Sequence, residues 1–166
     1  MVTQQRLKEL IHYDPETGVF RWRIKPCDRI AAGAIASNIS KTHGYVRIGI
    51  DCRRYQAHRL AWLYMTGSCP TESIDHKNGN RTDNRFANLR AATATINNQN
   101  QRRARSDSKI GMLGVSPNPG GPPGRKFAAF IRYEGRVRNL GNFATATEAH
   151  EAYVAAKRKH HPGGTL

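Results

Sequence analysis

The amino-acid sequence predicts an α+β protein in which short antiparallel strands alternate with a few helices. Alternating apolar residues and tight turns predict two strand pairs, 45–50 with 53–56 and 126–133 with 136–141. Apolar residues recur at helical spacing in three further segments, 3–12, 57–66 and 146–160. A basic and then small, polar stretch separates the two strand pairs, as expected of a linker. The predicted organisation is an N-terminal domain over 1–105, a linker over 106–111 and a C-terminal domain over 112–166.

The composition points to a polyanionic partner. The 166 residues include 27 Lys and Arg against 12 Asp and Glu, a formal net charge of +15. Such an excess, interspersed with aromatic residues, is typical of nucleic-acid-binding proteins, and double-stranded DNA is the expected partner. A ribosomal or membrane-surface protein is the alternative.

Three cysteines lie far apart in the sequence, at Cys27, Cys52 and Cys69. This spacing argues against a zinc ribbon and against a disulfide scaffold, and favours a reducing cytosol. No apolar run approaches the roughly 18 residues of a membrane span, and no apolar signal core follows the first residues. We therefore expect a cytoplasmic protein that is not secreted and has no membrane partner.

The N-terminal elements lead up to one polar stretch. A helix over 3–12 is expected to be capped by Thr3, and a helix over 57–66 to end at Gly67. His58 lies in the first turn of this second helix. It is either a packed or surface histidine, or a residue that contacts a phosphate or supports a nearby site.

The stretch from Ser73 to Asn97 concentrates residues that can bind a metal and activate water. It predicts a short strand at 74–76, a loop to 84, a returning segment and a helix over about 94–104. Asp75 and Asn97 offer hard oxygen ligands, and His76 offers a base that titrates near neutrality. Asn88 could hold the loop or orient the His76 ring. From these residues alone, a turn-rich loop and a metal site are about equally supported.

The spacing of these residues resembles the HNH endonuclease motif, closest to the phage and intron-encoded homing type. The matching pattern is Asp75-His76-x-Asn78-Gly79-Asn80-Arg81-x-Asp83-Asn84-Arg85-x-x-Asn88-Leu89-Arg90, with Asn97 nine residues further on. The segment Ala57-His58-Arg59-Leu60-Ala61-Trp62 also resembles the sequence usually found upstream.

The resemblance implies a ββα-metal core over about 57–104. His76 would be the general base, Asp75 and Asn97 the metal ligands, and Asn88 the residue that orients His76. It further implies a divalent-metal-dependent DNA endonuclease, expected to be a site-specific homing enzyme that nicks or cuts both strands. The cofactor would be Mg²⁺ or Mn²⁺, with no structural zinc. A phage-encoded protein would work in the host cytosol.

The C-terminal domain resembles the DNA-binding domain of plant ethylene-response factors. The matching residues are Gly114-Val115, Lys126-Phe-Ala-Ala-x-Ile-Arg132, Leu140-Gly-x-Phe143 and the segment from Thr145 to Lys157. The resemblance implies a three-stranded antiparallel sheet packed on one C-terminal helix, with the sheet in the major groove. Lys126 and Arg132 fall on contact positions. Asn139 stands where a contacting Trp is usual, so we expect the base readout to differ.

Basic residues in both domains are candidates for DNA contacts. They are Arg85, Arg90, Arg102, Arg103, Arg105, Arg125, Lys126, Arg132, Arg136 and Arg138. The protein would act as a monomer or as a dimer on DNA. Two rival functions are a non-catalytic sequence-specific DNA-binding protein on the same scaffold and an RNA-directed nuclease. Adjacent His160 and His161 are expected to form a polar helix cap and not a metal pair.

Overall fold

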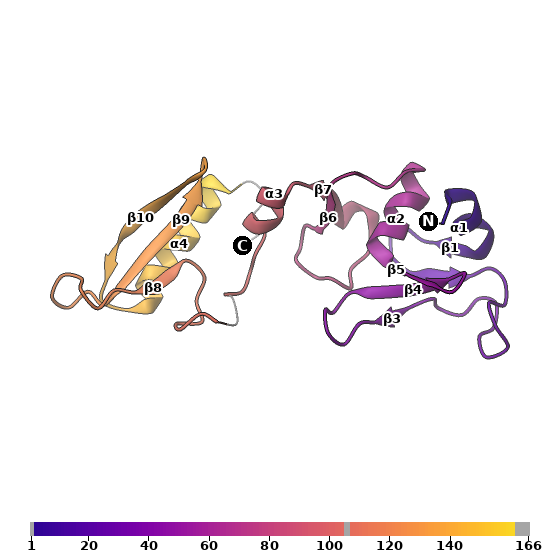
Figure 1. Ribbon diagram of the computed structural model, residues 1–166, viewed down its shortest axis with the longest axis horizontal. Coiled ribbons are helices and arrows are strands. Elements are labelled where there is room, and N and C mark those ends of the chain that lie inside the picture. The colour runs from indigo at the N-terminus through magenta and orange to yellow at the C-terminus, as the bar shows by residue number, and fades with distance from the viewer. Residues whose placement is uncertain (1, 105–106, 162–166) are drawn as a thin grey trace. The chain divides into compact units, whose positions relative to one another are not determined.

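The computed structural model describes residues 2–104 and 107–161 as a mixture of helices and antiparallel sheets. It divides into two compact units, Met1–Thr93 and Ala94–Leu166. The predicted domain limits at 105 and 112 remain predictions. No helix in the described residues is long and apolar enough to cross a membrane. Each unit has its own sheets and its own core (Figure 1).

The first unit contains most of the helices and strands. In chain order they are α1 Gln4–Leu10, β1 Ile11–Tyr13, β2 Phe20–Trp22, β3 Asn38–Ile39, β4 Val46–Ile50, β5 Arg53–Gln56, α2 Ala57–Thr66, β6 Ser73–His76, the 3₁₀ turn η1 Phe86–Asn88 and β7 Leu89–Ala92. The strands form three small antiparallel sheets, β1–β2, β3–β4–β5 and β6–β7. The predicted helix over 3–12 ends earlier, at Leu10, because Ile11 pairs with Trp22 as a strand residue.

One apolar core holds these small sheets and the two helices together. Leu7 of α1, Ile48 of β4 and Leu60 of α2 are among its buried members, and Ile74 and Leu89 join it from β6 and β7. Helix α2 ends at Gly67 with φ +80°, the left-handed conformation that glycine adopts without steric cost. Packing against this core places the β6–β7 hairpin, which carries the polar stretch.

The second unit is a three-stranded sheet with one long helix. Its elements are α3 Ala94–Gln99, β8 Val115–Pro117, β9 Phe127–Tyr133, β10 Arg136–Phe143 and α4 Ala146–His160. The strand order is β10–β9–β8, and α4 packs along the sheet (Figure 1). The predicted turn at Glu134-Gly135 is confirmed, with both residues at positive φ. The sequence predicted this hairpin and α4 correctly because the turn residues and the Thr145 cap act through neighbours in the chain.

Helix α3 is shorter than predicted, ending at Gln99 and not near 104. None of its residues is buried, so tertiary packing adds little to a helix of six residues. Beyond α3, the buried Lys157 ammonium donates to the backbone carbonyl of Gln101. This contact ties the segment after α3 to α4.

Side chains cap α4 at its N-terminal end, whereas the two histidines at its C-terminal end contact β9 and do not cap the helix with their rings. Thr145 Oγ1 accepts a hydrogen bond from the Glu148 backbone N–H, and Glu148 Oε2 accepts one from Ala144. At the other end, His161 Nε2 lies 2.8 Å from the Arg132 carbonyl oxygen, while the His160 ring stacks on Tyr133. His161 therefore ties the end of the helix to β9.

We expect Gly114→Ala to destabilise the second unit by about 2–4 kcal/mol, combining backbone strain with overpacking. Gly114 has φ +73°, and an added Cβ would lie 2.0 Å from the Tyr153 ring. Urea denaturation of the variant measures this loss. Gly111→Ala is the matched control, because Gly111 has φ +72° but nothing within 4 Å of its Cβ position. Equal losses in the two variants would contradict the close contact with Tyr153.

Candidate active site

The β6–β7 hairpin places Asp75 and His76 next to each other and buries both. The two residues are 8% and 3% exposed. Asp75 lies opposite Arg90 in the antiparallel register. The Nε and Nη2 atoms of Arg90 both donate to Asp75 Oδ2, at 3.1 and 2.7 Å. Arg90, a predicted DNA contact, is therefore an ion-pair partner of Asp75. Buried charged groups in proteins are usually paired in this way.

Asn88 holds the loop that follows His76. Its Oδ1 accepts from the Asn78 backbone N–H at 3.0 Å, and its Nδ2 donates to the Asp83 carbonyl at 2.8 Å. Of the two roles predicted for Asn88, its described hydrogen bonds serve the loop.

Asp83 stiffens the same loop through Arg85, whose guanidinium donates to both of its carboxylate oxygens. These hydrogen bonds are the main reason that the pKa of Asp83 is lowered to about 2. The Arg85 side chain is 53% exposed, so it could still reach a phosphate.

His76 contacts Asn84, which the sequence analysis placed only at the end of the loop. His76 Nε2 and Asn84 Oδ1 are 3.4 Å apart, and Asn84 is 3% exposed. Asn84 Nδ2 lies 3.1 Å from the Thr82 carbonyl, which can only accept, so Oδ1 is the atom facing His76. No local sequence signal distinguishes Asn84 from its loop neighbours, because its role depends on tertiary burial.

This contact selects one tautomer of His76. Because the amide oxygen of Asn84 can only accept, His76 Nε2 must carry the proton and donate it. The lone pair of a neutral His76 ring then lies on Nδ1. A neutral imidazole with a defined basic nitrogen is what general-base catalysis requires.

His58 packs directly on His76. Their ring centroids are 5.0 Å apart in an edge-to-face arrangement, and the Tyr45 ring is 5.2 Å from His58 and 6.0 Å from His76. Burial, with a smaller contribution from His76, lowers the pKa of His58 to about 3. Burial also lowers the pKa of His76, although the Asn84 hydrogen bond and Asp75 oppose that shift. Both rings are therefore neutral at neutral pH.

The oxygen donors fit a hard divalent cation. Asp75 provides a carboxylate, and magnesium sites commonly use one or two carboxylates and complete their coordination with water and phosphate oxygens. Asn97, the other predicted ligand, lies on α3 in the second unit and is exposed. No cluster of three His, Cys, Asp or Glu side chains suited to a metal occurs within 2–104 and 107–161.

The strand register separates the predicted DNA contacts of the second unit into two faces of the sheet. Val137 lies opposite Arg132, while Arg138 lies opposite the buried Ile131. Because side chains alternate along a strand, Arg132 and Arg138 point to opposite faces. The Arg138 guanidinium lies 5.4 Å from the centre of the Tyr133 ring, which stacks on His160 of α4. Arg138 is thus on the helix side of the sheet.

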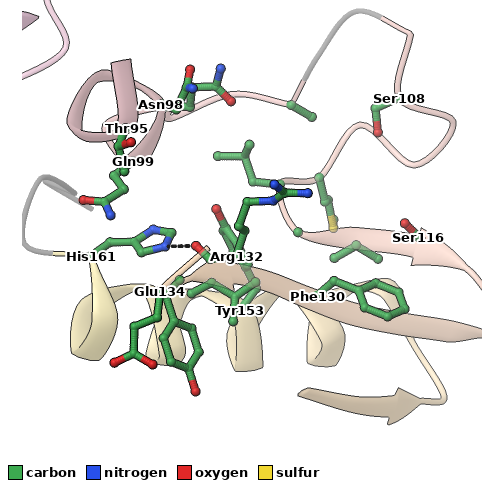
Figure 2. A pocket seen from close by; sticks show the side chains of 18 of the residues that line it. Thr95, Asn98, Gln99, Ser108, Ser116, Phe130, Arg132, Glu134, Tyr153 and His161 are labelled. Carbon is green, nitrogen blue, oxygen red and sulfur yellow. Dashed lines mark hydrogen bonds between the residues drawn. The ribbon is translucent and has the colours of Figure 1, made fainter. Parts of the chain in front are cut away.

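Arg132 projects from the sheet into a cleft of about 750 Å³ within the second unit (Figure 2). The cleft is lined by residues of α3, β8 and β9, and by His161. His161 Nδ1 and Gln99 Oε1 are buried without a hydrogen-bond partner in the described structure. The cleft from which Arg132 projects is therefore lined in part by polar side chains, those of Gln99 and His161.

The remaining predicted DNA contacts are exposed. Arg125 and Lys126 precede β9, Arg136 begins β10, and Arg102 and Arg103 follow α3. Arg105 lies outside the described residues. These positions leave the charged groups accessible to a phosphate backbone.

A further basic surface lies on the β3–β4–β5 sheet of the first unit. Lys41, Arg47 and Arg54 line a cleft of about 390 Å³ that has no acidic lining residue. None of the three forms an ion pair with any described part of the chain. The alternation of Tyr45-Val-Arg-Ile-Gly-Ile, which buries Val46, Ile48 and Ile50, could have identified Arg47 as outward-facing.

Residues 55–99 match the HNH endonuclease family. The chain is also similar to a solved structure described as "DNA binding and cleavage by the HNH homing endonuclease I-HmuI", with 30% identity and a TM-score of 0.42. That similarity covers 55% of this chain and 51% of the other, so this chain spans about half of its length. No curated protein matches the chain. The segment that carries Asp75, His76, Asn84 and Asn88 is thus similar to HNH endonucleases, a family of nuclease enzymes.

Proposed function

We propose that this chain is a divalent-metal-dependent endonuclease that hydrolyses phosphodiester bonds in double-stranded DNA. One observation carries the proposal: the buried His76 directly follows the buried Asp75 on β6, within a segment that matches the HNH endonuclease family. The hydrogen bond to Asn84 leaves the basic nitrogen at Nδ1. A base and a hard oxygen ligand carried by one short strand are suited to phosphodiester hydrolysis.

In this reaction His76 Nδ1 removes a proton from water as the water oxygen attacks phosphorus. The new P–O bond forms as the bond to the leaving oxygen breaks. The leaving oxygen takes up a proton from solvent water, and His76 then returns its extra proton to solvent. His58, neutral because of its burial, adds no charge that would oppose protonation of His76. Asn84 remains a hydrogen-bond acceptor for Nε2–H throughout the proton transfer.

Asp75 and Asn97 would hold Mg²⁺ or Mn²⁺. A bound divalent cation supplies Lewis-acid stabilisation of the negative charge on the leaving oxygen. The ion pair with Arg90 limits how far the Asp75 carboxylate can turn. This arrangement favours a cation whose coordination is completed by water and by the substrate phosphate.

Basic surfaces in both units support DNA as the substrate. Lys41, Arg47 and Arg54 in the first unit, and the exposed arginines of the second, can neutralise phosphates. We infer that the second unit is an ethylene-response-factor-like DNA-binding domain that gives the enzyme site specificity of the homing type. It would act as a monomer or as a dimer on DNA.

Supercoiled plasmid is the substrate that tests the proposed activity. Incubation with magnesium should convert it into nicked circles or linear DNA, and an added chelator should stop the reaction. Nicked circles indicate that one strand is cut, and linear DNA indicates cutting of both strands. An unchanged plasmid that nevertheless binds the protein would instead support a non-catalytic DNA-binding protein.

We expect Arg132→Ala to weaken binding to a preferred sequence by about 1–3 kcal/mol if Arg132 contacts a base. Arg132 leaves β9 on the face opposite to Ile131 and is exposed. Titration of labelled duplexes of different sequence measures the change. Arg138→Ala is the matched control, because Arg138 points to the α4 side of the same sheet. A loss that is equal on all sequences would identify Arg132 as a phosphate contact.

A further inference from the structure

The backbone of Asn84 is held by a tyrosine from near the start of the chain. The Tyr13 hydroxyl of β1 donates to the Asn84 carbonyl oxygen at 2.7 Å, and both residues are buried. Tyr13 is itself packed between Phe20, with ring centroids 4.5 Å apart, and Tyr64, at 5.6 Å. Burial raises the pKa of Tyr13 far above its ordinary value, so the hydroxyl stays protonated and remains a donor. A rigid side chain thus fixes the position of the Asn84 peptide.

The turn between β1 and β2 touches the same backbone. A Cβ on Gly18 would lie 2.5 Å from Arg85 N and 2.6 Å from Asn84 C. Gly18 also has φ +73°, which favours glycine for a second reason. Close by, the Phe86 backbone N–H donates to the Pro15 carbonyl at 3.0 Å. The turn and the loop are therefore in direct backbone contact, with no room for a side chain between them.

Asn84 transmits this positioning to His76. Its side chain is oriented by the hydrogen bond from Nδ2 to the Thr82 carbonyl, which leaves Oδ1 facing His76 Nε2. The separation of 3.4 Å is at the long end for a hydrogen bond, so a small shift of the Asn84 backbone would break it. Whatever fixes the Asn84 backbone therefore also controls which nitrogen of His76 carries the proton.

We propose that Tyr13 and Gly18 are positioning residues for His76, which act by holding the Asn84 carbonyl and backbone so that the Asn84 amide oxygen keeps the proton of His76 on Nε2. Both lie outside residues 55–99, the segment that matches the HNH family. The β1–β2 hairpin then supports the active site by holding the Asn84 backbone, although none of its residues contacts the substrate. The expected effect on the cleavage rate rests on the proposed function, in which His76 is the general base. The expected effect on the tautomer of His76 does not depend on that function.

The test is Tyr13→Phe in the full-length chain, which removes only the hydroxyl. Nitrogen-15 NMR of the histidine rings distinguishes Nε2-protonated from Nδ1-protonated imidazole. We expect His76 to be mainly Nε2-protonated in the native protein and to become a mixture of tautomers in Tyr13→Phe. Cleavage should slow roughly fivefold through kcat with KM unchanged, the size expected from the loss of one hydrogen bond.

Two further variants complete the test. Asn84→Ala removes the acceptor itself and should give the same mixture of tautomers with a larger loss of kcat, about 10- to 100-fold, as for other groups that orient an active-site side chain. Tyr55→Phe is the matched control, because its hydroxyl makes no hydrogen bond within the described structure, and it should change neither readout.

The NMR result decides the proposal even if the protein cleaves no DNA. An unchanged His76 tautomer in both Tyr13→Phe and Asn84→Ala overturns it. A change in Asn84→Ala alone would overturn the role of Tyr13 while keeping that of Asn84. Conversely, a tautomer that shifts as expected in a chain without nuclease activity would refute the proposed function and leave the positioning intact.

Discussion

His76→Ala should abolish DNA cleavage while leaving DNA affinity nearly unchanged. The variant loses the group that takes the proton from the attacking water, and general-base catalysis typically contributes about 10²–10⁴-fold to the rate. His76 is 3% exposed and lies among buried side chains, so it has little surface with which to bind DNA. Binding energy and catalysis should therefore separate in this variant.

Single-turnover cleavage of plasmid DNA and a parallel binding titration measure the two quantities. His12→Ala is the control, because His12 is an exposed residue of β1 and its replacement leaves the candidate site intact. Full cleavage by His76→Ala would eliminate the general-base assignment. An equal loss of cleavage and of affinity would show instead that the loop around His76 had unfolded, which far-UV circular dichroism and a melting curve would reveal.

Asp75→Asn should remove cleavage at magnesium concentrations that saturate the native protein. The substitution exchanges a charged carboxylate for a neutral amide of the same shape, and hard cations bind the charged oxygen more strongly. It also leaves the Arg90 guanidinium without its anion, and the loss of such charged hydrogen bonds costs about 1.5–3 kcal/mol of stability. Activity and stability are both expected to fall, for different reasons.

Arg90→Gln separates these two effects. It breaks the same ion pair but keeps the carboxylate that would hold the cation, so it should share the stability loss and retain cleavage. Magnesium titrations of cleavage for the native chain and both variants provide the comparison. If the Asp75→Asn variant cleaved DNA at the native rate and needed the same magnesium concentration as the native chain, Asp75 would not be the metal ligand.

Local signals in the sequence were sufficient for several elements of the fold. Helix α4 runs from Ala146 to His160 as its periodicity and its Thr145 cap predict, and α2 ends at Gly67. The tight turns at Asp51-Cys52 and Glu134-Gly135 are confirmed by positive φ values at those residues. These features depend on neighbours within a few residues, so the sequence carries their physical cause.

The spacing of the polar stretch also identified the site segment, since Asp75 and His76 lie together on β6 as predicted and the segment matches the HNH family. The segment alone did not distinguish the roles of its asparagines. Asn84 is predicted only as the end of the loop, and Asn88 either as a residue that holds the loop or as one that orients His76. The described hydrogen bonds join Asn84 to His76 and Asn88 to the loop.

The sequence by itself determined helices α2 and α4, the two hairpin turns and the short segment that matches the HNH family. Only the tertiary structure decided which groups meet: Tyr13 with Asn84, 71 residues apart, His58 with His76, and Arg90 with Asp75. Strand register likewise separated Arg132 from Arg138, which the sequence could not distinguish. The physical reason is that helices, caps and turns arise from interactions along the chain. The tautomer of a histidine, the partner of a buried charge and the sheet face on which an arginine lies depend instead on packing against residues that are distant in sequence.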